Sequence, residues 1–137
     1  MCIRDSSKAG FEATGFDIDP RKTEMLLRGE SYIHHIPAAS IAEAVGKKRF
    51  LATNDFARLR EMNAIIICVP TPLDKHREPD MSFVRNTAEM VRAHLQPGQL
   101  IVLESTTYPG TTDEEMLSIL EKTALKCPCL LYTSRCV

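Results

Sequence analysis

Residues 64–69, Ala-Ile-Ile-Ile-Cys-Val, form an unbroken apolar run rich in β-branched side chains. A strand with one solvated face alternates apolar and polar residues, whereas a strand covered on both faces of a parallel sheet reads as a continuous apolar run. Pro70 and Pro72 follow directly, and proline cannot continue a central strand because it lacks a backbone N–H. The run therefore predicts a short strand, buried on both faces, in a parallel α/β sheet.

Strand and helix signals alternate along the rest of the chain at the spacing of β-α-β units. Residues 11–19 read as a strand that ends in acidic residues. Asp19 and Pro20 then predict the start of a helix, which Gly29 ends. We expect further strands at 50–53 and 100–103, and further helices around 41–45, over Phe56 and Leu59, after an Asp80 cap, and after a capping box in which Thr111 or Thr112 precedes Glu114 or Glu115.

Composition limits the possible partners. The chain has 137 residues, enough for one domain with a core, and its net charge of -1 provides no electrostatic attraction to nucleic acid or anionic membrane. The longest apolar run is far too short to span a bilayer, and no apolar stretch follows the first four residues. We therefore expect a cytoplasmic protein without a nucleic-acid or membrane partner.

The two ends of the chain, residues 1–6 and 129–137, resemble translated sequencing adapter. Residues 1–6 can be encoded by ATG TGT ATA AGA GAC AG plus a pyrimidine, and residues 129–134 by TGT CTC TTA TAC ACA TCT. These two strings are reverse complements over most of their length. We therefore expect both tails to be non-native and take 7–127 as the native segment. Of the five cysteines, this segment retains Cys68 and Cys127, which implies no disulfide framework.

Polar residues follow three of the expected strands, at 17–19, 70–72 and 104–107. In an open α/β sheet, ligands bind beyond the carboxyl ends of the strands. A carboxylate at Asp17 can accept hydrogen bonds from both hydroxyls of an adenosine ribose and would repel a 2′-phosphate, which favours NAD over NADP. Lys22 is close enough in sequence to contact the ribose or an adjoining phosphate. The alternative for this strand end is a helix cap beside a solvated carboxylate.

Three stretches, AGFEATGFDIDPRK, AIIICVPTPLDKHREPDMSFV and LIVLESTTYPGTTDE, together resemble the UDP-glucose/GDP-mannose dehydrogenase family of nucleotide-sugar 6-dehydrogenases. The resemblance covers residues 7 to about 122, and the PTPLDKHREPD loop is most similar to the branch that oxidises UDP-N-acetylhexosamines. Members oxidise the sugar C6 alcohol to a carboxylate in two NAD⁺-dependent steps. A cysteine in a later part of the chain holds the aldehyde-level intermediate as a thiohemiacetal.

The resemblance also implies site residues. Asp17 matches the adenosine-ribose ligand, with Lys22 beside it, and Thr71 matches a threonine that contacts the cofactor. Thr107 matches the threonine beside the nicotinamide that helps to position the catalytic water. Ser105 and Thr106 line the same turn. The alternative for these hydroxyls is ordinary turn chemistry, since such groups readily bond to nearby backbone.

The printed sequence contains no GxGxxG turn, which in this family follows the first strand and presents backbone and a helix N-terminus to the pyrophosphate. We therefore expect residues 7–127 to form a partial NAD-binding Rossmann domain, an incomplete doubly wound parallel sheet that lacks the first strand and the glycine-rich loop. The missing strand would lie between the acidic-ended strand and the Ile-rich one. The chain alone is expected to bind NAD weakly and to be inactive, while the full-length protein is expected to bind a UDP-sugar and form a homo-oligomer.

Two alternatives stay open from the sequence: another Rossmann-type NAD-dependent dehydrogenase, and a non-catalytic α/β interaction module. The first is not expected to combine CVPTP with ESTTYPG at this spacing, and the second would need a complete sheet of its own. Cys68 is expected to be an inert core residue rather than the nucleophile. His34 and His35 lack the partner spacing of a metal site, and no metal is expected.

Overall fold

The structure is a computed structural model that describes residue 6 and residues 9–32, 36–73, 75, 79–105 and 107–123. His34, His35, Thr106, Cys127 and the suspected tails apart from Ser6 lie outside these described residues. The chain divides into two compact units, Met1–Phe56 (unit 1) and Ala57–Val137 (unit 2).

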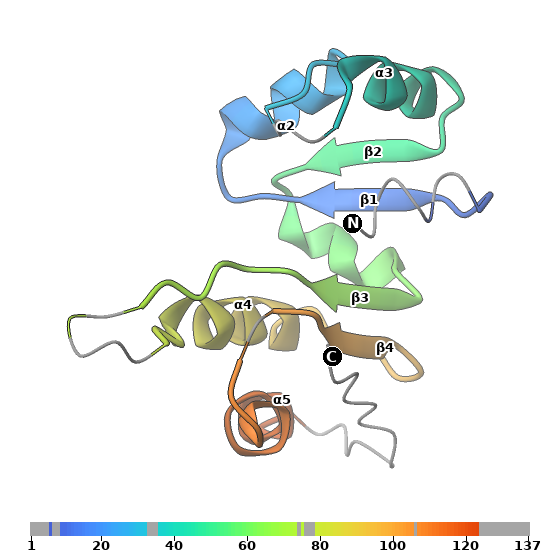
Figure 1. Cartoon of the computed structure of the whole chain (residues 1–137). Coiled ribbons are helices and arrows are strands. Elements are labelled where there is room, and N and C mark those ends of the chain that lie inside the picture. Colours follow the sequence, from blue (N-terminus) through green and yellow to red (C-terminus); the bar gives the residue numbers. More distant parts are fainter. Residues whose placement is uncertain are drawn as a thin grey trace. The chain divides into compact units, whose positions relative to one another are not determined.

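Unit 1 is a β-α-α-β arrangement (Figure 1). Strand β1 (Ala13–Phe16) pairs in parallel with β2 (Phe50–Thr53), with Ala13 opposite Phe50 and Phe16 opposite Thr53. Helices α2 (Pro20–Leu27) and α3 (Ala38–Gly46) connect the strands and both pack against β2. The buried core of the unit consists of Leu26, Ile36, Ile41, Phe50 and Ala52.

The first turn of α2 is built as the sequence predicts. The Asp19 side chain accepts a hydrogen bond from Arg21 N at 3.0 Å, which satisfies a backbone donor that the helix itself cannot pair. Pro20 occupies the first helical position, where a missing N–H costs nothing. Gly29 has φ +78° and ends the helix, because few other residues adopt this left-handed conformation without strain.

Unit 2 has a β-α-β core followed by a last helical segment. A 3₁₀ helix, η1 (Phe56–Glu61), leads into strand β3 (Ala64–Ile67), which pairs in parallel with β4 (Leu100–Leu103). Helix α4 (Ser82–Arg92) connects the two strands, and the π-helix η2 (Thr112–Leu117) continues into α5 (Ser118–Leu120). Both η2 and α5 pack against α4. The buried apolar residues of this unit are Leu59, Ile65, Ile67, Met81, Val84, Ala88, Val91, Met116, Ile119 and Leu120.

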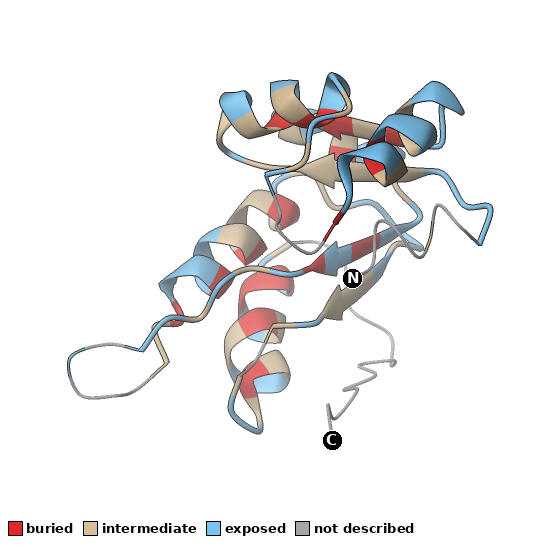
Figure 2. Ribbon diagram, turned by 45° about the horizontal axis from the view of Figure 1, so that its top comes forward, coloured by how far each residue is buried: buried red, intermediate tan, exposed pale blue. Residues whose placement is uncertain are grey.

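The prediction that β3 is buried on both faces is wrong for the described part of the chain. Ile65 and Ile67 are buried, whereas Ala64 and Ile66 are exposed, the latter at 41% (Figure 2). Cys68 is exposed too, so it is not a core residue. Successive side chains of a strand point to opposite faces of the sheet, and the described residues cover only one face of β3. The apolar run is therefore a strand with one uncovered face.

The predicted capping box at residues 111–115 is also wrong. Thr111 makes no capping hydrogen bond; its Oγ1 donates instead to the Tyr108 carbonyl at 2.8 Å. The side chain is only 1% exposed, and the backbone then forms a π-helix rather than an α-helix. Asp80 is predicted to cap the helix that follows it. Its carboxylate does accept a hydrogen bond from Ser82 N at 2.9 Å, although Met81 occupies the N-cap position of α4.

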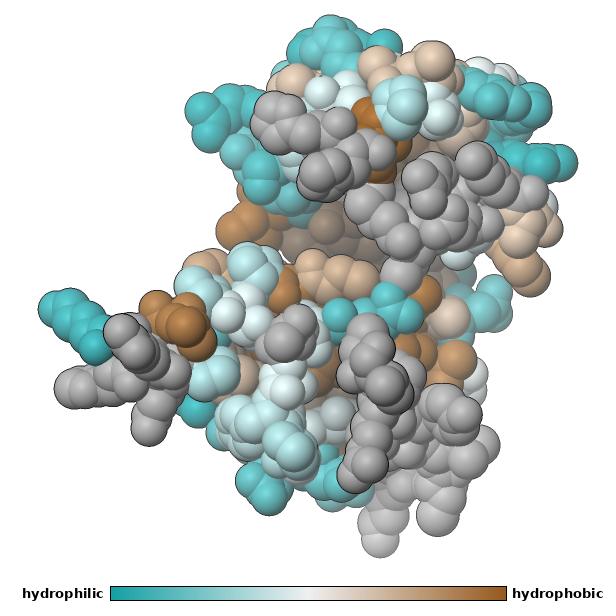
Figure 3. Space-filling model, viewed as in Figure 1, coloured by the Kyte–Doolittle hydropathy of each residue, from teal (hydrophilic) through white to brown (hydrophobic). Residues whose placement is uncertain are grey.

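The described strands form two separate two-stranded parallel sheets, β1-β2 and β3-β4. This confirms the predicted α/β class, and it agrees with an incomplete sheet in which the acidic-ended strand and the Ile-rich strand do not pair. Apolar side chains reach the surface in both units (Figure 3), including Phe11 and Ile18 in unit 1 and Leu73 and Leu100 in unit 2. Among the residues described, no helix is both long enough and apolar enough to cross a membrane.

Candidate functional site

Asp17 follows β1 directly, at the carboxyl end of the strand. Its backbone N–H donates to Thr53 O at 3.3 Å, which extends the strand pairing by one residue. Its side chain is 24% exposed and accepts from Asp19 N through Oδ1 at 2.9 Å. The second oxygen, Oδ2, lies 3.5 Å from Lys22 Nζ. Asp17 therefore presents a partly exposed carboxylate whose orientation is fixed by the first turn of α2.

Lys22 lies between an anion and an aromatic ring. Its Nζ is 3.5 Å from Asp17 Oδ2 and 5.6 Å from the centroid of the Tyr32 ring, within the range of a cation–π contact. Burial, followed by the charge of Asp17, raises the pKa of the Tyr32 phenol. The structure thus brings Asp17 and Lys22 together, as the sequence predicts, and adds Tyr32 to them.

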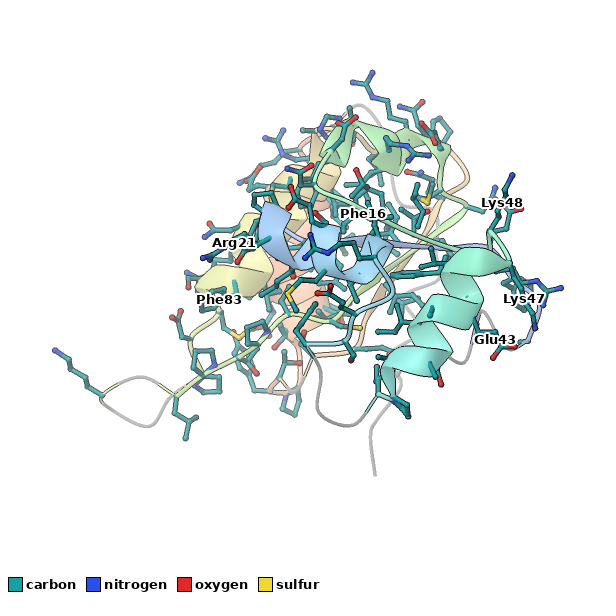
Figure 4. All side chains as sticks on the ribbon, turned by 90° about the horizontal axis from the view of Figure 1, so that it is seen from above. Phe16, Arg21, Glu43, Lys47, Lys48 and Phe83 are labelled. Carbon is teal, nitrogen blue, oxygen red and sulfur yellow. The ribbon has the colours of Figure 1, made fainter. Side chains whose placement is uncertain are left out.

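A second ion pair lies next to this cluster, on the first turn of α2. Arg21 reaches back to Asp19 with Nε at 3.1 Å from Oδ1 and Nη2 at 3.0 Å from Oδ2. Hydrogen bonds from the Arg21 side chain and backbone lower the pKa of the Asp19 carboxyl, and the Asp19 carboxylate raises the pKa of Arg21. Figure 4 shows Arg21 on the outer side of α2, where its side chain is 86% exposed. Asp19 therefore caps the helix and pairs with Arg21, whereas Asp17 pairs with Lys22.

In unit 2, the ends of β3 and β4 are joined by Ser105. Its Oγ accepts a hydrogen bond from Val69 N at 3.0 Å and donates one to Val69 O at 2.8 Å. Val69 precedes Pro70 and Thr71, so the hydroxyl fixes the start of the Pro-Thr-Pro turn. Cys68 Sγ lies 3.9 Å from Glu104 Oε2 in the same region.

Thr71 and Thr107 are half-buried residues in the turns that follow β3 and β4. The Ser105–Val69 bonds place these two turns at the same end of the β3-β4 sheet. Thr106, the remaining predicted residue, lies outside the described part of the chain. Asp17 and Lys22 belong to unit 1, and the described residues Thr71, Ser105 and Thr107 belong to unit 2.

The interactions of three residues, Tyr108, Arg85 and Glu115, were not predicted from the sequence. Tyr108 Oη donates to Glu115 Oε1 at 3.3 Å, and Arg85 Nε donates to Glu115 Oε2 at 2.7 Å. Arg85 and Glu115 are 30 positions apart, so no local pattern pairs them. Tyr32 was likewise missed, although its place in the loop after α2 brings it close to Lys22.

The chemistry of these side chains suits a dinucleotide better than a metal. A partly exposed carboxylate beside an ammonium group can bind a ribose diol, and hydroxyl-bearing turns can bond to the polar edge of a nicotinamide. Among the described residues, no group of three or more His, Cys, Asp or Glu side chains is placed to hold a metal ion.

Comparison with known proteins supports the same interpretation. The profile of the UDP-glucose/GDP-mannose dehydrogenase family, NAD binding domain, matches residues 2–130. A UDP-N-acetyl-D-glucosamine 6-dehydrogenase from Pseudomonas aeruginosa is 33% identical over 108 residues, which are 79% of this chain and 25% of that protein. A UDP-N-acetyl-D-mannosamine dehydrogenase from Escherichia coli K12 is 32% identical over 75% of this chain and 24% of its own length.

Solved structures agree with these matches. The NDP-N-acetyl-D-galactosaminuronic acid dehydrogenase from Methanosarcina mazei Go1 superposes with a TM-score of 0.74 at 34% identity, over 81% of this chain and 25% of that one. A GDP-mannose dehydrogenase from Pseudomonas aeruginosa has a TM-score of 0.84 at 23% identity and covers 88% of this chain and 29% of its own, which supports the fold alone. The chain spans about a quarter of the length of the curated relatives it matches. It belongs to the UDP-glucose/GDP-mannose dehydrogenase family, within the NAD-binding domain.

Proposed function

We propose that this chain is the NAD-binding part of a nucleotide-sugar 6-dehydrogenase that oxidises the C6 alcohol of a UDP-sugar to the carboxylate in two hydride transfers. The observation that carries the proposal is the family match across residues 2–130, together with a carboxylate at the end of β1 that suits a ribose diol. The same match favours this function over another Rossmann-type dehydrogenase and over a non-catalytic α/β module.

The contacts proposed for NAD are the ones that the family resemblance implies. Asp17 would accept the hydroxyls of the adenosine ribose, with Lys22 beside it. Thr71 and Thr106 would contact the cofactor, and Thr107 would lie beside the nicotinamide. Ser105 would hold the turns after β3 and β4 together through Val69. When bound, NAD⁺ supplies the hydride acceptor. Thr107 is proposed to help position the catalytic water.

The substrate is proposed to be a UDP-N-acetylhexosamine, of which UDP-N-acetylglucosamine is the first candidate. Support comes from the PTPLDKHREPD loop and from the relatives named as UDP-N-acetyl-D-glucosamine and UDP-N-acetyl-D-mannosamine dehydrogenases. Uronic acids made in this way are building blocks for surface polysaccharides, so we place the full-length protein in polysaccharide biosynthesis in the cytoplasm, as a homo-oligomer. Residues 7–127 are proposed as the native segment, which on its own would bind NAD weakly and lack dehydrogenase activity.

The test is to recover the contiguous coding sequence, to express its product and to follow NADH formation with UDP-N-acetylglucosamine, UDP-N-acetylmannosamine and UDP-glucose. We expect a GxGxxG strand-turn-helix upstream, a cysteine-bearing domain downstream, and two NADH formed per N-acetylhexosamine oxidised. A natural start codon just before Ser7, or no NADH with any UDP-sugar, would overturn the proposal. Faster turnover of UDP-glucose would overturn the substrate assignment alone.

A further inference from the structure

The turn that carries Thr107 is tied to helix α4 by three side chains, Arg85, Tyr108 and Glu115, which we call the brace. Arg85 donates to both carboxylate oxygens of Glu115, through Nε at 2.7 Å and Nη2 at 3.2 Å. Such a bidentate ion pair fixes the relative orientation of the two side chains as well as their distance. Tyr108 Oη donates to Glu115 Oε1 at 3.3 Å, so the residue that follows Thr107 is attached to the pair.

Tyr108 is also held through its backbone. Its carbonyl accepts from Thr111 Oγ1 at 2.8 Å and from Thr111 N at 3.3 Å. Thr111 is 1% exposed, so this anchor is inside the unit rather than on its surface. Between them, Gly110 has φ +94°, and a Cβ there would lie 2.8 Å from Glu114 Oε1. The residue after Thr107 therefore has one anchor at its side chain and another at its carbonyl.

The ionisation states of the brace residues determine which group donates and which accepts each hydrogen bond. Hydrogen bonding from Arg85 lowers the pKa of the Glu115 carboxyl, so Glu115 accepts near neutral pH. Loss of solvation, and then the Glu115 charge, raises the pKa of the Tyr108 phenol, so Tyr108 remains a donor. Glu115 lies in the π-helix η2, and its carboxylate contacts both partners.

We propose that Arg85, Glu115 and Tyr108 are positioning residues for Thr107, holding its turn in one conformation against α4. The inference rests on the proposed function, in which Thr107 lies beside the nicotinamide. A surface ion pair with no such role would contribute little and would leave the turn unaffected when removed. Arg92 and Glu89 provide that comparison: they pair within α4 at 2.6 Å, and Glu89 Oε1 also lies 3.8 Å from Lys122 Nζ.

The test is NMR relaxation and amide exchange on the 137-residue chain, with the variants Arg85→Ala, Glu115→Ala and their combination. In the wild type we expect an order parameter of about 0.85 for the Thr107 amide, falling below about 0.6 in each single variant. Hydrogen exchange of the Thr111 amide should accelerate by about threefold to tenfold in each single variant. The double variant should show no further acceleration, because both substitutions remove the same interaction. Arg92→Ala is the matched control and should change either quantity by less than about a quarter.

A second readout separates positioning from a general loss of structure. With ¹³C-labelled tyrosine, the pKa of Tyr108 should fall in Glu115→Ala and stay unchanged in Arg92→Ala. Tyr108→Phe removes only the hydroxyl and should lower the Thr107 order parameter even if the Ala variants fail to fold. A wild-type Thr107 that is already mobile, or equal responses in Arg85→Ala and Arg92→Ala, would overturn the proposal. None of these measurements uses NAD, so they can fail or succeed independently of the proposed function.

Discussion

Ser105 and Val69 exchange two hydrogen bonds across 36 positions of sequence: Ser105 Oγ accepts from Val69 N at 3.0 Å and donates to Val69 O at 2.8 Å. A serine hydroxyl has a single proton, and here it is committed to the Val69 carbonyl. Ser105 therefore joins the turns after β3 and β4, and its only hydroxyl proton is used within the fold.

Ser105→Ala should destabilise unit 2. The change leaves the Val69 N–H and C=O without their partner in a part-buried position, which costs about 1–2 kcal/mol of unfolding free energy. Urea unfolding of the chain, followed by circular dichroism, measures the loss. Ser118→Ala is the control, because it removes an exposed local bond to Glu115 O and should cost less than about 0.5 kcal/mol. Equal effects of the two variants would contradict the joining role of Ser105.

Asp17→Ala should reduce selectivity for NAD over NADP. The change removes the proposed ribose acceptor and leaves the Lys22 ammonium, now 3.5 Å from Asp17 Oδ2, free to attract a 2′-phosphate. NMR titration of the chain with each dinucleotide at millimolar concentration should show the NAD/NADP affinity ratio fall by at least about tenfold. Arg21→Ala, which keeps the Asp17–Lys22 pair, should leave NAD binding unchanged. A ratio that stays the same in Asp17→Ala would remove Asp17 from the ribose site.

Local features of this fold could be predicted from the sequence, because they depend on neighbours in the chain. Asp19 as the cap of α2, Gly29 as its end and the strands at 50–53 and 100–103 all follow from residues within one turn or strand. The proximity of Asp17 and Lys22 could also be predicted from the sequence, because the end of the strand and the first helical turn are adjacent in the chain.

Features set by distant packing could not be predicted. The exposed face of β3 depends on which segments cover the sheet, and an apolar run is the same whether its second face is covered or not. Thr111 looked like a helix cap, but burial beside the Tyr108 carbonyl gave its hydroxyl a different partner. Arg85 and Glu115 meet only because η2 packs on α4.

Acid should weaken the start of α4 through Asp80. Hydrogen bonds from the backbone and side chain of Ser82 lower the pKa of the Asp80 carboxyl below its ordinary value of 3.8. A carboxyl with a lower pKa in the folded state adds stability that is present above the unfolded pKa and is lost as the pH falls through the folded pKa. Asp80→Asn should therefore show a shallower loss of stability below about pH 4 than the wild type.

Urea midpoints measured at a series of pH values test this dependence. Ser82→Ala is the matched variant: it removes the side-chain bond but keeps the larger backbone bond to Asp80, so its pH dependence should stay close to that of the wild type. If Asp80→Asn and the wild type lost stability in parallel as the pH fell, the carboxylate would have no role at this helix start.

Gly29→Ala should be among the most damaging small substitutions in unit 1, and Gly46→Ala among the mildest. Gly29 has φ +78°, and a Cβ there would lie 2.9 Å from Ala42 Cβ and 3.1 Å from Ala42 Cα. The left-handed conformation alone costs an alanine about 1–2 kcal/mol, and the contact with α3 adds to it. Gly46 has open space around its Cβ direction and ends α3, so alanine there should be neutral or stabilise by up to about 1 kcal/mol.

Adding Ala42→Gly to Gly29→Ala separates the two costs. The double variant removes the closest contact, so it should recover part of the lost stability and retain the backbone penalty. Thermal and urea unfolding of the single and double variants provide the comparison. Equal stability of Gly29→Ala and Gly46→Ala would mean that Gly29, just after α2, does not approach Ala42 of α3 in solution.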